Sequence, residues 1–88
     1  MDPQSASRLR QIILDALALR ASHATFCPSE LARLADPVHW RALMPWVREA
    51  ARSLAREGAI QVLQRGVALS PDDEWRGPIR IGRPRREG

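Results

Sequence analysis

The chain has 88 residues, 44% of them hydrophobic and 27% charged, which fits one small folded domain and leaves no room for a separate catalytic domain. Its single cysteine excludes an internal disulfide, and no apolar run reaches the roughly 18 residues of a membrane span. We therefore expect a cytoplasmic protein that is stabilised by packing alone, without a signal peptide or membrane anchor.

The charge is uneven along the chain. All 14 basic residues are arginines, and the formal net charge is +4. Residues 1–40 hold four arginines and four acids, whereas residues 41–88 hold ten arginines and six acids. This excess in the second half favours a polyanionic partner, although a GC-rich coding bias would also replace lysine with arginine, and +4 also serves solubility.

The first half predicts two helices joined by an extended connector. Ser5 or Ser7 can cap a first helix that reaches about Arg20. Within it, apolar residues recur on one helical face: Leu9, Ile12, Ile13, Ala16 and Leu17. Residues 21–26 form the connector, whose last two residues are suited to a short strand.

The second helix begins at the stretch C-P-S-E. Pro28 suits the first helical position, and Glu30 stands three residues after Cys27, where its carboxylate can return to the amide of the cap residue. This helix is expected to end near Ala35. Asp36 and the proline after it form a second pair of cap residue and first-position proline, which opens a brief turn.

The pattern from residue 45 onward predicts a helix and then a hairpin. Pro45 is expected to start the third helix and Gly58 to end it. Apolar residues then alternate, and a two-residue turn at Arg65-Gly66 would place Gln64 opposite Val67 and Val62 opposite Leu69. After an acidic turn, residues 75–81 are expected to pack on the body as an arm through three apolar residues: Trp75, Ile79 and Ile81.

Three helices followed by a hairpin predict a mainly α fold, a winged helix-turn-helix with the hairpin as its wing. A three-helix bundle with an accessory hairpin is the structural alternative. We assign residues 1–81 to this domain and residues 82–88 to a disordered basic tail.

The candidate nucleic-acid-binding residues lie on the third helix, the wing and the tail. Arg48, Arg52 and Arg56 recur every four residues, opposite a buried stripe, and Arg65 falls at the wing tip. In the tail, Arg83 and Arg85 belong to a Gly-Arg-Pro-Arg-Arg segment that is similar to the core of an AT-hook. The alternatives are a solvated helix face neutralised by its own acids, and a tail that only confers solubility.

Other chemistry has weaker support. His23, Cys27 and His39 supply too few ligands for a structural zinc, and nothing marks a catalytic site, so we expect no metal, no cofactor and no enzymatic activity. A thiol at a helix start could act as a redox sensor, but Cys27 is more simply a helix-start residue. Trp40 and Trp46 are expected to fill the core.

Four segments resemble a known family: T-F-C-P-S-E-L-A-R (25–33), W-R-A-L-M-P-W-V-R-E-A-A (40–51), L-A-R-E-G-A-I-Q-V-L-Q-R-G (54–66) and G-P-I-R-I (77–81). They resemble a small bacterial family known only as a domain of unknown function. The resemblance implies a winged-helix-like fold and supplies no activity, ligand or catalytic residue. The sequence thus predicts a protein that binds duplex DNA through the third helix and wing, or alternatively a protein-interaction module without nucleic-acid binding.

Overall fold

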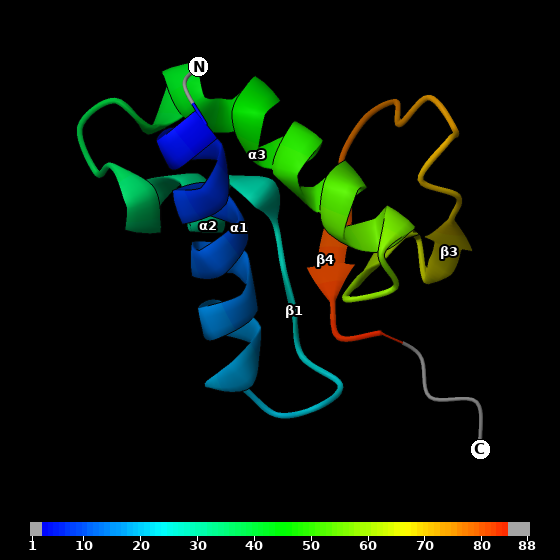
Figure 1. Ribbon diagram of the computed structural model, residues 1–88. Helices are drawn as coiled ribbons and strands as arrows, with labels where there is room; N and C mark the ends of the chain where they lie inside the picture. Colours follow the sequence, from blue (N-terminus) through cyan, green and yellow to red (C-terminus); the bar gives the residue numbers. More distant parts are fainter. Residues whose placement is uncertain (1–2, 85–88) are drawn as a thin grey trace.

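A computed structural model describes residues 3–84, and within that range the chain forms three helices and four strands (Figure 1). In chain order they are α1 (Pro3–Ala18), β1 (Thr25–Phe26), α2 (Pro28–Ala35), α3 (Trp40–Arg56), β2 (Gln61–Gln64), β3 (Val67–Leu69) and β4 (Arg80–Gly82). The predicted class, three helices with a small antiparallel sheet in a winged-helix-like layout, is confirmed. No helix in this part of the chain is long and apolar enough to cross a membrane.

The helices pack on one another and on the sheet around a single apolar core. α1 contributes the predicted face, with Leu9, Ile13, Ala16 and Leu17 buried, while Ile12 is only half-buried. α1 begins at Pro3, before the serines expected to cap it, and ends at Ala18. The remaining core residues are Phe26, Leu31, Ala32, Val47, Ala50, Ala51, Leu54, Ile60, Val62, Trp75, Ile79 and Ile81.

The predicted start of α3 at Pro45 was wrong, because the helix begins at Trp40 and holds Pro45 inside it. Asp36 explains the earlier start: its Oδ1 accepts hydrogen bonds from the amides of Val38 and His39, both at 3.0 Å. These bonds turn the chain directly into the helix. Pro45 then costs one backbone bond, since it has no N–H to donate to the carbonyl of Arg41.

The predicted end of α3 is confirmed. Gly58 has a φ of +74°, a conformation that a residue without a Cβ adopts freely. Its amide donates to the carbonyl of Ala55 at 3.0 Å, and the amide of Ala59 donates to that of Leu54 at 3.0 Å. Together these two bonds close the helix in a Schellman motif and direct the chain toward β2.

The β2–β3 hairpin has the predicted register, with Val62 opposite Leu69 and Gln64 opposite Val67. Its two central residues, Arg65 and Gly66, have φ values of 52° and 80°, as a type I′ turn requires. Val62 is buried, but the side of the hairpin near the turn extends beyond the core, where Val67 is 64% exposed.

The predicted arm packs on the body as expected and also forms β4. Trp75, Ile79 and Ile81 are all buried. β4 pairs with both β1 and β2 in the antiparallel order β1-β4-β2-β3, so the last strand joins the first to the hairpin. Gly82 is buried within β4, and the strand therefore crosses the predicted boundary between domain and tail. A Cβ at this glycine would lie 3.2 Å from Cγ2 of Thr25, which favours the smallest residue there.

Candidate nucleic-acid interface

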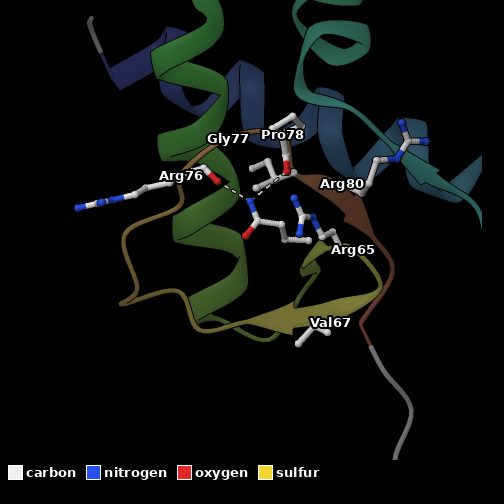
Figure 2. Close-up of a pocket in the computed structure, with 8 residues that line it drawn as sticks. Arg65, Val67, Arg76, Gly77, Pro78 and Arg80 are labelled. Carbon is white, nitrogen blue, oxygen red and sulfur yellow. Dashed lines mark hydrogen bonds between the residues drawn. The ribbon is translucent and has the colours of Figure 1, made fainter.

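The β2–β3 hairpin and the segment before β4 enclose an open depression of about 740 Å³, which we call the wing groove (Figure 2). Its lining residues are Gln64, Arg65, Val67, Arg76, Gly77, Pro78, Ile79 and Arg80. Gln64 holds the groove together, because its side-chain amide donates to the carbonyl of Arg76 and, at 3.3 Å, to that of Pro78. The hairpin and the returning chain are thereby fixed to each other.

Three arginines are distributed along the wing groove. Figure 2 shows Arg65 in the middle, with the side chains of Arg76 and Arg80 extending to either side. Arg80 donates to Oγ1 and to the carbonyl of Thr25, both at 2.9 Å, and Arg76 pairs with Glu74 at 3.0 Å while remaining 83% exposed. None of the described lining residues is acidic, so the groove has a local excess of positive charge.

Arg65 lies at the tip of the turn, and its guanidinium has no partner among the described residues. It is exposed, and it makes no hydrogen bond or ion pair with any residue between positions 3 and 84. Its φ of 52° lies in the left-handed region, which costs a residue with a Cβ about 1 kcal/mol and favours glycine or asparagine. Arginine therefore occupies a backbone position that other residues would fill with less strain.

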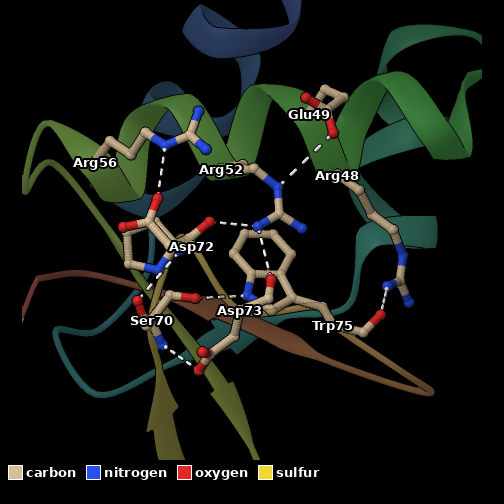
Figure 3. Close-up of polar contacts among 9 residues, drawn as sticks. Arg48, Glu49, Arg52, Arg56, Ser70, Asp72, Asp73 and Trp75 are labelled. Carbon is tan, nitrogen blue, oxygen red and sulfur yellow. Dashed lines mark hydrogen bonds and ion pairs between the residues drawn. The ribbon is translucent and has the colours of Figure 1, made fainter.

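The predicted arginine row of α3 faces a loop that folds back over the helix (Figure 3). We call this loop, residues 70–77, the strap. Arg48 binds its far end, donating from Nη1 to the carbonyl of Trp75 at 3.0 Å and from Nη2 to that of Gly77 at 2.8 Å. Arg48 therefore anchors the strap to α3.

Arg52 holds the middle of the strap. Its Nη1 donates to the carbonyl of Pro71 and, at 2.8 Å, to that of Asp73. Its guanidinium also stacks on the indole of Trp75, which in turn donates from Nε1 to the carbonyl of Ser70 at 2.9 Å. The side chain of Arg52 is only 20% exposed. The strap and the helix thus share one cluster of cation, ring and backbone carbonyls.

Arg56 is the most exposed member of the row, and its Nε lies 3.4 Å from Oδ1 of Asp72 in the strap. Glu49, one turn earlier, pairs with Arg52 at 3.8 Å. All three arginines of the row are therefore engaged with residues of this chain. The regular spacing places all three arginines against the strap. The sequence pattern alone does not distinguish such a row from a bare nucleic-acid-binding face.

The arginines predicted in the tail differ in what the structure describes of them. Arg83 is half-buried against the end of α1, donating from Nε to the carbonyl of Leu17 at 3.0 Å and from Nη2 to those of Ala18 at 3.3 Å and Arg20 at 2.7 Å. Its guanidinium thus binds the last two carbonyls of α1 and one carbonyl just beyond the helix. Arg85 lies outside the described residues.

The C-P-S-E stretch begins α2 as predicted, with Pro28 in the first turn. The proposed return of Glu30 to the cap residue was wrong, because its carboxylate lies 3.7 Å from Nη1 of Arg20 instead. Cys27 is half-buried and makes no side-chain cap; its Sγ lies 3.1 Å from Oγ of Ser29. Between positions 3 and 84, no group of three metal-binding side chains is close enough to hold an ion.

The two tryptophans of α3 lie in different surroundings. Trp40 is half-buried and packs against the core, in agreement with its prediction. Trp46 is 42% exposed, so its prediction as a core residue was wrong. It lines a hollow of about 270 Å³ between α1 and α3, together with Ala6, Arg10, Glu49, Ala50 and Ser53.

Comparison with other proteins identifies the family of the chain. No curated protein matches the chain. The model of a family described as "Protein of unknown function (DUF3253)" matches residues 6–84. The match covers α2, α3 and every described strand, and with them the strap and the wing groove. The chain belongs to this family of proteins of unknown function, as its sequence resemblance implied.

Proposed function

We propose that the protein binds duplex DNA through the wing groove, with Arg65 as the principal phosphate contact. The observation that supports this most is the conformation of Arg65. An arginine in the left-handed region, at a turn position that asparagine or glycine fills better, retains local strain. That strain is understandable if the guanidinium itself is needed to bind an anion, since none of residues 3–84 pairs with it.

The arrangement of the neighbouring arginines supports a polymeric anion as the ligand. Arg76 and Arg80 extend to either side of Arg65 and do not converge on one point (Figure 2). A single small anion would be held better by converging donors, whereas a row of spaced guanidiniums suits the repeated phosphates of a nucleic-acid backbone. Contacts of this kind position a protein on DNA without reading its sequence.

In this proposal α3 supports the interface and does not enter the major groove. Arg48 and Arg52 bind carbonyls of the strap, and the strap continues directly into the segment that lines the wing groove. Arg48 and Arg52 therefore hold in place the chain that presents Arg76. This assigns them a role different from the base contacts predicted from their spacing.

The test is binding of a labelled duplex, followed by fluorescence anisotropy at increasing salt. Each phosphate contact contributes about 0.9 to the slope of log K against log salt, so Arg65→Ala should lower that slope by about one. Arg76→Ala should act in the same direction. Arg56→Ala is the matched control, because it removes the same charge from α3 at a side chain that is 56% exposed. It should leave the slope unchanged.

Two results would contradict the proposal. A wild-type protein without salt-dependent binding to any duplex at low ionic strength would exclude DNA as the ligand. A loss caused by Arg56→Ala and not by Arg65→Ala would exclude the wing groove in favour of α3.

The alternative function is a protein-interaction module, and the exposed indole of Trp46 favours it. This ring lies beside the hollow between α1 and α3, which is the kind of surface that a partner side chain fills. A partner bound there should remain bound at high salt and dissociate on Trp46→Ala. Pull-down of one stoichiometric partner with that behaviour would support this function.

A further inference from the structure

Two arginines are gathered on one tryptophan at the corner between α2 and α3. The guanidinium carbon of Arg33 lies 4.2 Å from the ring centroid of Trp40, and that of Arg41 lies 4.4 Å from it. Arg33 belongs to the last turn of α2, and Trp40 and Arg41 begin α3. Two positive charges are thus held near one ring. The two guanidinium carbons lie no farther apart than the sum of these two distances.

Neither guanidinium uses its hydrogen-bonding capacity within residues 3–84. Each arginine has five N–H donors, and neither Arg33 nor Arg41 has a hydrogen bond or ion pair with another residue in the described part of the chain. Both side chains are exposed. Most other described arginines donate to a carbonyl or a carboxylate, as Arg48 and Arg83 do.

The chain between these arginines is fixed in shape. Asp36 accepts the amides of Val38 and His39 through Oδ1, and its Oδ2 lies 3.2 Å from Nδ1 of His39. The two acids nearest to Arg33 in sequence are therefore both engaged elsewhere: Asp36 shapes the loop, and the carboxylate of Glu30 lies 3.7 Å from Nη1 of Arg20. The cluster is held by a defined turn, and its geometry is set before any ligand arrives.

We infer that this corner is a phosphate-binding site, in which the guanidiniums of Arg33 and Arg41 bind one phosphate group beside the Trp40 ring. A phosphate offers oxygens to both guanidiniums and relieves the repulsion between two like charges. The phosphate can come from a nucleic-acid backbone or from a free phosphate, since both present the same oxygens. The inference does not depend on the wing groove, which involves none of these residues.

The test uses the indole N–H signals of the three tryptophans in NMR spectra, titrated with inorganic phosphate at constant ionic strength. The Trp40 signal should shift and saturate. The Trp75 signal is the internal control, because its indole N–H is bonded to the carbonyl of Ser70. An unchanged Trp75 signal also reports that each variant remains folded.

Arg33→Gln and Arg41→Gln should each weaken the apparent phosphate affinity by about tenfold, because each removes one guanidinium that donates charge-assisted hydrogen bonds to the phosphate. Arg56→Gln, which removes the same charge from the far end of α3, should leave it unchanged. Equal titration curves for wild type and both glutamine variants would overturn the inference, as would a Trp40 shift that does not saturate.

A second titration, with a short duplex that lacks terminal phosphates, distinguishes the source of the phosphate. If the duplex shifts the Trp40 signal at lower concentration than inorganic phosphate, the ligand is the nucleic-acid backbone. If only inorganic phosphate shifts it, the ligand is a free phosphate. Repeating the inorganic-phosphate titration with Arg65→Ala separates this site from the wing groove, because that variant should still show the Trp40 response.

Discussion

The guanidinium carbon of Arg52 lies 4.1 Å from the ring centroid of Trp75, so a cation on α3 stacks on an aromatic ring from the strap. Trp75 is 6% exposed and belongs to the core, which makes Arg52 the link between the core and the surface loop. The same guanidinium donates to two strap carbonyls. The pair therefore determines how the outer face of α3 is covered.

We predict that Arg52→Ala lowers the free energy of unfolding by about 2 kcal/mol. The change removes two charge-assisted hydrogen bonds and a cation–π contact, and it leaves strap carbonyls without a donor. Thermal unfolding should show a fall of roughly 8–16 °C for a domain of this size. Arg65→Ala, whose guanidinium has no described partner, is the control and should not lower the melting temperature. If Arg52→Ala unfolds like wild type, the strap is not held by this residue.

The spacing of arginines on α3 illustrates what a periodic pattern can and cannot establish. Positions i, i+4 and i+8 place Arg48, Arg52 and Arg56 on one face of a helix, and that part of the prediction is confirmed. What covers the face depends on the path of the strap, which is set by burial of Trp75 about twenty residues later in the chain. Local periodicity carries no information about that contact.

The register of the hairpin was predictable because the two turn residues and the alternation of apolar residues in the strands agreed. The turn also allows a test of the strain at Arg65. We predict that Arg65→Asn raises the free energy of unfolding by about 0.5–1 kcal/mol, because asparagine tolerates a positive φ better than arginine does. The same variant should weaken duplex binding. Chemical denaturation and anisotropy on one preparation measure both effects. A variant that is less stable than wild type would contradict the assignment of strain to Arg65.

β4 was predicted as an arm and not as a strand for a physical reason. A run of three residues has too little alternation to indicate a strand, and β4 is extended by pairing with β1 and β2, which lie far away in sequence. The same long-range closure carries Arg83 onto α1. The hook-like pentad therefore gave no indication of what Arg83 contacts.

We predict that Arg83→Ala destabilises the fold by about 1–2 kcal/mol, because two backbone carbonyls at the end of α1 and one just beyond it lose a charged donor. Arg83→Lys should recover only part of this, since an ammonium cannot reach all three acceptors in the geometry of a planar fork. Hydrogen exchange localises the effect: the amides of the last turn of α1 should exchange faster in Arg83→Ala. Uniform acceleration across the chain, or none, would contradict the local role.

The stability of the protein should decrease as the pH is lowered through a range set by the pKa of Glu57. The hydrogen bond from Arg10, which joins α1 to the end of α3, lowers the pKa of Glu57 below its ordinary value of 4.5. A carboxyl whose folded pKa is lowered stabilises the fold above the unfolded pKa and loses that contribution as pH falls through the folded pKa. We therefore predict that Glu57→Gln is less stable than wild type at neutral pH.

The difference between Glu57→Gln and wild type should shrink as the pH falls below the ordinary carboxyl pKa of 4.5 and continue to shrink through the lower folded pKa. Melting temperatures of both proteins over this range provide the measurement. A difference that stays constant from neutral to acidic pH would show that the glutamine acts through packing and not through loss of the ionised group.

Cys27 should behave as a helix-start residue without redox chemistry. It precedes α2 with an extended backbone, at φ −82° and ψ 153°, and its thiol bonds no backbone amide. Serine at this position caps a helix well, so we predict that Cys27→Ser keeps the fold, raises the free energy of unfolding by about 0.5–1 kcal/mol and leaves duplex binding unchanged. The measurement is denaturation and anisotropy before and after peroxide treatment. Loss of binding on oxidation of the wild type, absent in Cys27→Ser, would instead show that the thiol is a switch.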